Sequence, residues 1–227
     1  MTSFYSGLIP PNSLVFDIGA NVGGFSFVFA STGARVVAVE PNADCVRHIQ
    51  LSFQTEAIQV VMAAAGPRDG LAQLNLSDER DDISSLSVEW IATMKERHPQ
   101  YAGLWSRQVT VPMVALDTLV KHYGMPYFIK IDVEGFEESV LDGLSVQPEL
   151  LSFEFNAATT DAAINCIDKP VIARASVFNF AYGDPTHFEL LEWVSREQLK
   201  TILLAMDRRD RHGDIFVKPR RAAGASG

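Results

Sequence analysis

The segment from Val15 to Gly24 constrains the fold of this chain most, because a glycine-containing turn directly follows an apolar run. It reads Val-Phe-Asp-Ile-Gly-Ala-Asn-Val-Gly-Gly, and a second apolar run at residues 36–39 ends at Glu40 and Pro41. A buried strand, a tight turn into a helix and a second buried strand ending in an acid form the adenosine-binding half of a doubly wound α/β sheet. The segment therefore predicts a site at the turn for a ligand with a free ribose.

Strand and helix patterns alternate over most of the chain, which favours a mainly parallel α/β sheet over a sandwich or a helical bundle. We predict strands at residues 14–18, 35–39, 58–63, 71–76, 108–113, 127–131, 150–155, 177–182 and 215–217. Helical patterns occur near residues 23–30, 44–55, 116–119, 137–141, 159–167 and 195–206. A length of 227 residues suits one domain with a substantial core. We expect a single domain over residues 1–219 and a disordered tail at 220–227.

Two segments are expected to add to this framework. Residues 77–107 begin with a charged run and continue with scattered aromatic side chains, which indicates a lid or insert with a helical portion. Residues 177–193 contain two apolar runs around Gly183-Asp184-Pro185. This pattern predicts a hairpin that contacts either the acceptor or a second copy of the chain in a homodimer.

Composition and charge restrict the partners and the compartment. The net charge is −9, whereas a protein that binds polynucleotide mainly through phosphates needs a positive surface, so we expect no nucleic-acid partner. No apolar run approaches the roughly 20 residues that span a bilayer, and the first residues lack a basic leader. The two cysteines are not in a metal-binding spacing. These features predict a cytoplasmic protein without membrane association.

Asn21 occupies the position at which a dinucleotide-binding turn has its second glycine. In such a turn that glycine lets the backbone approach a pyrophosphate, and the side chain of Asn21 fills this space. A ligand without phosphates fits better, and S-adenosylmethionine is such a ligand. Its methionine portion can lie over the turn while its ribose reaches the second strand. Glu40, at the end of that strand, can accept hydrogen bonds from both ribose hydroxyls.

The turn and the acid together predict which residues hold this cofactor. Gly19 and Gly23 allow the turn, and with Asp17 and Glu40 they favour cofactor binding over a simple strand-to-helix connection. Pro41 ends the second strand beside the expected site and is included among the cofactor-binding residues. Asp17 has two open roles, because its carboxylate can cap the loop backbone or bind the methionine amino group.

Three carboxylates are predicted beyond the carboxyl ends of neighbouring strands, where parallel sheets bind their ligands. Asp132 and Glu134 follow the apolar run at 127–131, and Glu154 lies in the apolar run at 150–155. Together they can position and deprotonate a hydroxyl group, or hold a divalent cation such as Mg²⁺ through oxygen ligands. Alternatively, Glu134 and Glu154 only bond to loop amides. We favour catalysis, with Asp132 as the base beside the cofactor.

Other ionisable residues are secondary candidates. Lys130 precedes Asp132 by two residues and therefore points to the same sheet face, where it is expected to pair with a carboxylate rather than react. The five histidines form no cluster in the sequence. Only His98 and His187 fall in loops that could face the site as a base.

The order and spacing of several motifs between residues 14 and 155 resemble the FkbM-type family of S-adenosylmethionine-dependent methyltransferases. The matching pieces are residues 15–25, Val39-Glu40-Pro41-Asn42, Ile83-Ser84-Ser85-Leu86, residues 115–119, residues 129–137 and Ser152-Phe153-Glu154. The Asp-Val-Glu-Gly-Phe-Glu element at residues 132–137 is the specific part, because many methyltransferases share the glycine turn.

The resemblance implies a Rossmann-like class I methyltransferase sheet, seven-stranded and mostly parallel, with an antiparallel last strand at residues 215–217. It also implies methyl transfer to oxygen, commonly a hydroxyl on a sugar or another natural product. The residues it assigns to the cofactor are Asp17, Gly19, Asn21 and Glu40, with Ser84 and Ser85 from the lid side. Those it assigns to the border of the reaction centre are Asp132, Glu134 and Glu154. Acceptor choice then depends on residues 77–107 and 156–193.

Three other functions stay open at this level. A nicotinamide-dependent dehydrogenase is disfavoured by Asn21 and by the lack of a Tyr-x-x-x-Lys pair or a second domain. A non-catalytic module that binds an adenosine cofactor is disfavoured by the presence of Glu40 and the three carboxylates. Methylation of RNA is disfavoured by the negative charge, whereas a protein acceptor is compatible with the sequence. The acceptor that we expect is a small hydroxylated molecule.

Overall fold

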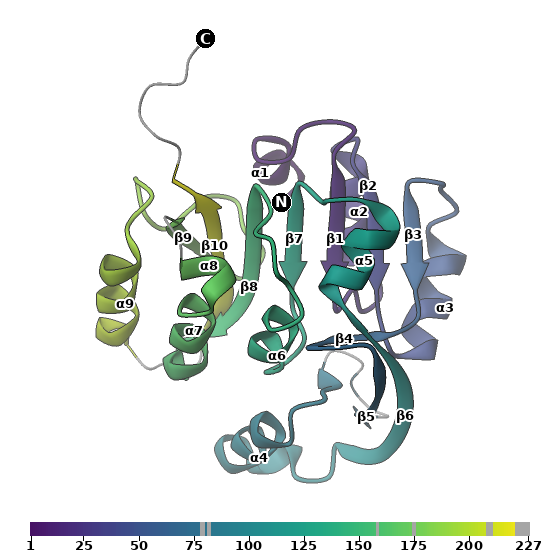
Figure 1. The fold of residues 1–227 in the computed structure, drawn as a ribbon. Coiled ribbons are helices and arrows are strands. Elements are labelled where there is room, and N and C mark those ends of the chain that lie inside the picture. Colours follow the sequence, from purple (N-terminus) through teal and green to yellow (C-terminus); the bar gives the residue numbers. More distant parts are fainter. Residues whose placement is uncertain (78–79, 81–82, 158, 174–175, 208–210, 221–227) are drawn as a thin grey trace.

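A seven-stranded sheet runs through the molecule in the order β3-β2-β1-β7-β8-β10-β9 (Figure 1). The computed structural model describes residues 1–77, 80, 83–157, 159–173, 176–207 and 211–220. The strands of this sheet are β1 (Leu14–Ile18), β2 (Arg35–Val39), β3 (Ile58–Val61), β7 (Phe128–Ile131), β8 (Leu150–Asn156), β9 (Ser176–Tyr182) and β10 (His212–Pro219). β10 is antiparallel to both of its neighbours, and the remaining neighbours pair in parallel. The predicted fold class is confirmed.

Helices cover both faces of this sheet. One face carries α1 (Thr2–Ser6), α2 (Gly24–Ser31) and α3 (Ala43–Ser52). The other carries α5 (Leu116–Tyr123), α6 (Glu137–Leu141), α7 (Thr160–Ile167), α8 (Pro170–Ala173) and α9 (Arg196–Ala205). All residues of β1 and β7 are buried, because helices cover both sides of these strands. This burial explains why both strands read as continuous apolar runs in the sequence rather than as alternating ones.

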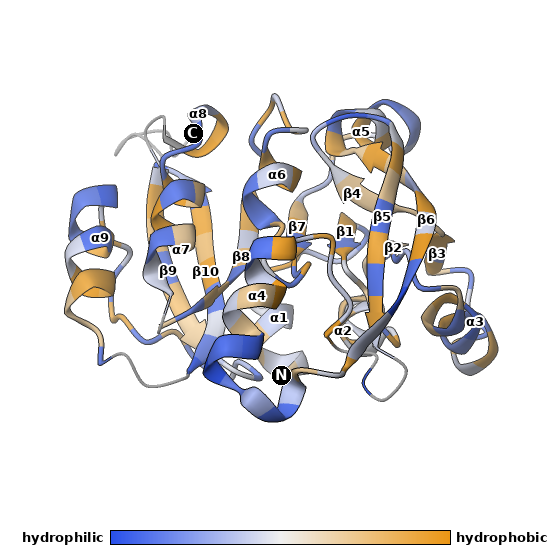
Figure 2. Cartoon of the chain, turned by 90° about the horizontal axis from the view of Figure 1, so that it is seen from below, coloured by the Kyte–Doolittle hydropathy of each residue, from blue (hydrophilic) through white to orange (hydrophobic). Residues whose placement is uncertain are grey.

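A second, three-stranded sheet lies beyond the carboxyl ends of the main strands (Figure 1). It consists of β4 (Ala64–Gly66), β5 (Gly70–Ser77) and β6 (Trp105–Ala115), with β6 in the middle. Hydrophobic and hydrophilic residues alternate along β5 (Figure 2), which buries Leu74 and Leu76. The predicted lid or insert at 77–107 connects β5 to β6, and its helical portion is α4 (Val88–Arg97) with a 3₁₀ turn at Pro99–Tyr101. Within it, residues 78–79 and 81–82 lie outside the described residues.

The predicted hairpin at residues 177–193 is formed only in part. β9 pairs with β10, and residues 188–193 form no strand. The returning segment nevertheless runs antiparallel beside β9, because Phe178 and Val194 exchange two backbone hydrogen bonds of 2.8 Å and the N–H of Glu189 donates to the carbonyl of Phe180. The side chain of Asn179 bonds to both the backbone N–H and the carbonyl of Leu190, so a side chain replaces part of a second ladder. The apolar character of the returning segment comes from core packing. Phe188 lies edge-to-face against Phe216 of β10, with ring centroids 5.1 Å apart.

Two further expectations concern the ends and the membrane. Apart from residue 220, the tail predicted at 220–227 lies outside the described residues. In the part of the chain that the structure describes, no helix is long and apolar enough to cross a membrane.

Candidate active site

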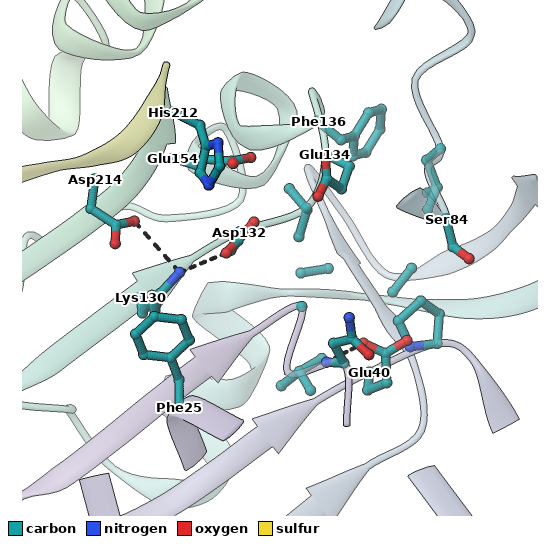
Figure 3. A pocket seen from close by; sticks show the side chains of 18 of the residues that line it. Phe25, Glu40, Ser84, Lys130, Asp132, Glu134, Phe136, Glu154, His212 and Asp214 are labelled. Atoms are coloured by element: carbon teal, nitrogen blue, oxygen red, sulfur yellow. Dashed lines mark hydrogen bonds and ion pairs between the residues drawn. The ribbon is translucent and has the colours of Figure 1, made fainter. Parts of the chain in front are cut away.

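A cavity of about 440 Å³ opens at the carboxyl ends of the main strands (Figure 3). It lies where the chain order of the sheet reverses between β1 and β7, the place at which open α/β sheets bind ligands. The predicted site residues that line it are Gly19, Asn21, Glu40, Pro41, Ser84, Asp132, Glu134 and Glu154. The other three, Asp17, Gly23 and Ser85, are buried outside the lining. The structure thus brings the glycine turn, the acid of β2 and the three carboxylates to one cavity.

The glycine turn brings the backbone of β1 close to that of β7. Gly19 has a φ of 80°, and a β-carbon there would overlap the backbone oxygen of Asp132. The backbone N–H of Asp132 donates to the carbonyl of Ile18 at 2.9 Å, which continues the β1–β7 ladder into the site. Asn21 has a φ of 49° and lines the cavity, as Asn tolerates this left-handed conformation.

Glu40 forms the wall of the cavity at the end of β2 and is only 6% exposed. One carboxylate oxygen accepts the backbone N–H of Asn21 and the other accepts that of Asn42, each at 2.8 Å. A carboxylate offers about four acceptor positions, so two amides do not exhaust it. The two amides hold the plane of the Glu40 carboxylate at the cavity wall.

Asp17 supports the turn from behind. It accepts a hydrogen bond from the hydroxyl of Ser26 in α2 and is 2% exposed. Burial raises its pKa to about 6, and the hydrogen bond from Ser26 acts in the opposite direction. Of its two open roles, anchoring of local structure is the one visible in these contacts. A contact with the methionine amino group stays a prediction.

The carboxylates of Asp132, Glu134 and Glu154 converge on one point (Figure 3), with one oxygen of each within 4.8 Å of the others. Asp132 and Glu134 follow β7, and Glu154 comes from β8 next to it. Burial raises the pKa of Glu154 well above its usual value, and the charges of Asp132 and Glu134 raise it further. Such a group favours a positive charge or a proton beside it, which suits either proton transfer or cation binding.

A buried ion-pair network lies under this group. Lys130 is 1% exposed, and its ammonium lies 2.7 Å from Asp132 and 3.5 Å from Asp214, over the ring of Phe25. Burial acts to lower the pKa of Lys130, but the two carboxylates outweigh it and hold that pKa well above the usual value. Lys130 is therefore a charged donor rather than a base, as predicted. Asp214 on β10 also lines the cavity, which the sequence reasoning missed.

The turn that carries Glu134 is held from two sides. Glu134 has a φ of 53°, unusual for a residue with a side chain, and Gly135 follows at 86°. The carboxylate of Glu137 accepts the backbone N–H groups of Val133 and Gly135, so Glu137 performs the amide-capping role considered for Glu134 and Glu154. Burial raises the pKa of Glu137 to about 7. The hydroxyl of Ser85 donates to the carbonyl of Glu134 at 2.6 Å.

Residues of the insert close the remaining side. The Ser84 hydroxyl is buried at the cavity wall and has no hydrogen-bond partner among the described residues, whereas Ser85 serves the acidic turn. Trp90 of α4 packs over Gly135, where a β-carbon would overlap its indole. Neither His98 nor His187 lines the described part of the cavity. His212, at the start of β10, does line it and had no signal in the sequence beyond its position before an apolar run.

Comparison with known proteins identifies the family to which this chain is similar. The family described as "Methyltransferase FkbM domain" matches residues 17–200. The AMB antimetabolite synthetase AmbE of Pseudomonas aeruginosa is 41% identical over 64 residues, which are 27% of this chain and 3% of that protein. The match therefore spans only a small part of this relative.

Several solved structures with a similar fold and low sequence identity are described as methyltransferases. A putative methyltransferase from Streptococcus mutans, SMU.1697c, solved in complex with SAH, is 10% identical with a TM-score of 0.44 over 96% of this chain and 94% of that one. An rRNA methylase from Streptococcus thermophilus is 11% identical with a TM-score of 0.46, over 97% and 94% of the two chains.

Proposed function

The chain belongs to the FkbM-type family of S-adenosylmethionine-dependent methyltransferases, and from this premise we propose that it methylates a hydroxyl oxygen of a small molecule, such as a sugar or another natural product. The observation that carries the proposal is the common cavity of the glycine turn, Glu40 and the three carboxylates. One end suits the cofactor and the other suits removal of a proton.

The end of the cavity formed by β1, β2 and the small sheet would hold the cofactor. Glu40 would accept the ribose hydroxyls, and the apolar side chains of Val39, Pro41 and Leu74 would border the adenine. The buried hydroxyl of Ser84 supplies a polar contact from the insert. Gly19 and Asn21 would hold the methionine portion, and the cofactor would supply the methyl group to an acceptor beside Asp132.

The reaction needs alignment and a proton acceptor. Transfer would require the acceptor oxygen in line with the S–CH₃ bond at roughly 3 Å, so that its lone pair forms the O–C bond while the electrons of the C–S bond return to sulfur. Asp132 takes the proton that the hydroxyl loses. Lys130 orients the Asp132 carboxylate through the 2.7 Å contact, and Glu134 and Glu154 border the acceptor.

The site formed by the three carboxylates could instead hold a divalent cation such as Mg²⁺, which can be tested. Hard cations take oxygen ligands, and Asp132, Glu134 and Glu154 each offer an oxygen within 4.8 Å of the others, so this donor set fits. The cation, when bound, would lower the pKa of a coordinated acceptor hydroxyl. Turnover in EDTA, compared with turnover after addition of MgCl₂, tests this role directly.

The first experiment is thermal unfolding with S-adenosylmethionine, S-adenosylhomocysteine and NADH added separately. A ligand at 100 times its Kd adds about 2.7 kcal/mol to the free energy of unfolding, which is a shift of several degrees. We expect shifts with the two sulfur nucleotides, lost in Glu40→Ala and retained in Glu56→Ala, an exposed acid away from the cavity. A shift with NADH alone overturns the proposal. Wild-type turnover by Asp132→Asn overturns the role of Asp132.

A further inference from the structure

The two ends of the cavity differ in charge. Around Glu40 the lining is mostly apolar, with Val39, Pro41 and Leu74 among its side chains. The opposite end, formed by β7, β8 and the β9–β10 region, carries five carboxylates, those of Asp132, Glu134, Glu154, Asp184 and Asp214. Among the described residues that line the cavity, Lys130 is the only lysine or arginine. This second end is the part of the cavity that the proposed function leaves for the acceptor.

Lys130 does not neutralise this end. Its ammonium is buried beneath the cavity and lies between Asp132 and Asp214, so its charge is shared by these two carboxylates. Glu154 and Asp184 have no ion pair with a basic side chain among the described residues. Asp214 is 4% exposed and lines the cavity, and its Oδ1 atom has the ion pair with Lys130 at 3.5 Å as its contact.

An acceptor that fills this end removes water from the carboxylates. Burial of a carboxylate without a partner is costly, so a neutral acceptor leaves that cost uncompensated and a phosphorylated one adds repulsion. A positively charged group compensates it. Phe136 lies beside Glu134 in the cavity wall (Figure 3) and offers an aromatic surface of the kind that binds ammonium groups.

We propose that the acceptor is a hydroxylated amine, whose protonated amino group is bound by Glu154 and Glu134 while its hydroxyl lies against Asp132. This inference rests on the proposed function and names the substrate class of the same site. An ammonium held between carboxylates keeps its proton and has no lone pair to attack the methyl group. The hydroxyl oxygen is therefore the nucleophile, its proton passes to Asp132, and the product carries the methyl group on oxygen.

Matched acceptors test the charge requirement. Glucosamine, homoserine and ethanolamine are each compared with the N-acetyl derivative, which keeps the hydroxyl and loses the charge. Methyl transfer from labelled S-adenosylmethionine is measured with EDTA present and, separately, with MgCl₂. We expect at least one amine to be methylated on oxygen with a kcat/KM about tenfold or more above that of its N-acetyl derivative. Glu154→Gln should bring this ratio close to one, whereas Glu192→Gln, an exposed acid outside the cavity lining, should leave it unchanged.

The other outcomes separate the two proposals. Equal or better methylation of the N-acetyl derivatives overturns the inference and leaves the O-methyltransferase proposal intact. A methyl group on nitrogen, or an amine preference that requires Mg²⁺, also overturns the inference, because the carboxylates then bind a nucleophile or a metal ion. If S-adenosylhomocysteine binds but no compound of either set is methylated, the inference and the proposed function both fail.

Discussion

The hydroxyl of Ser85 donates a 2.6 Å hydrogen bond to the backbone carbonyl of Glu134, so a residue of the insert holds the acidic turn in place. Ser85 also accepts the backbone N–H of Ser87, one residue before α4, at 2.9 Å. Its neighbour Ser84 faces the cavity instead. The two adjacent serines therefore have different surroundings: Ser85 contacts the acidic turn, and Ser84 lines the cavity in which we propose that the cofactor binds.

Substitution of these serines should separate the roles in kinetics. Ser85→Ala removes a bond to a turn whose φ at Glu134 is already unfavourable, so we expect about 1 kcal/mol lower stability and a kcat reduced about tenfold. The affinity for S-adenosylhomocysteine should not change. Ser84→Ala should weaken that affinity and leave stability the same. Isothermal titration measures the affinity of both variants for S-adenosylhomocysteine, and urea unfolding measures their stability. An equal loss of affinity in the two variants would contradict this division.

Gly19 and Gly24 provide a matched pair within one motif. A β-carbon at Gly19 overlaps the backbone oxygen of Asp132, and its φ of 80° is unfavourable for any L residue, whereas a β-carbon at Gly24 enters open space. We expect Gly19→Ala to lose cofactor binding and to unfold at a markedly lower temperature. Gly24→Ala, in the first turn of α2, should be neutral or stabilising by about 0.5 kcal/mol. Cofactor binding by Gly19→Ala at wild-type affinity would show that the close approach of β1 and β7 is not required.

Local patterns account for the parts of the fold that the sequence predicted well. β1, β2 and α6 have the predicted bounds, because an apolar run next to a glycine turn, or a helix ending before Gly143, is decided by neighbouring residues. α9 likewise begins where the helix at 195–206 was predicted, at a capping box formed by Ser195 and Gln198. The convergence of Asp132, Glu134 and Glu154 was predictable from their places at the ends of adjacent parallel strands.

Contacts between distant segments account for the rest. The partner of β9 is β10, thirty residues further on, and no property of residues 188–193 distinguishes a strand from an apolar segment packed on Phe216. Asp214 enters the site only because β10 inserts beside β8, in register with Glu154. The role of Ser85 depends on the insert folding back onto the acidic turn, 49 residues away. Sequence patterns indicated that these residues are polar or apolar, but not which surface they meet.

The side chain of Lys130 should be more important for the stability of the fold than for binding of the cofactor. Lys130→Met leaves the buried carboxylate of Asp214 and the partly exposed one of Asp132 without their cationic partner, so we expect a loss of about 3 kcal/mol or more in urea unfolding. Asp214→Asn in the same chain removes one of the two charges and should restore part of that loss. A double-mutant cycle then gives a coupling energy of about 1–3 kcal/mol between the two residues. Additive losses would mean that the Lys130–Asp214 contact contributes nothing.

The raised pKa of Asp17 predicts how stability depends on pH. Burial raises this pKa from 3.8 to about 6, so the folded state holds a proton that the unfolded state has already released at the same pH. The free energy of unfolding therefore decreases as pH rises from about 4 to about 6, by up to about 3 kcal/mol from this group, and is constant above. Asp17→Asn removes this contribution, so the stability of wild type minus that of the variant should fall across this interval.

Ser26 determines the pH interval over which the protonation of Asp17 affects stability. Its hydroxyl donates to the ionised Asp17 carboxylate and lowers the pKa, so Ser26→Ala should raise that pKa and move the loss of stability to higher pH. Urea unfolding between pH 4 and 8, with Asp17→Asn as the reference in each background, measures both effects. A stability difference that rises with pH would mean that Asp17 folds as a stabilised carboxylate. The hydrogen bond would then outweigh burial, and Asp17 would carry its charge under the cofactor at every pH at which the protein is folded.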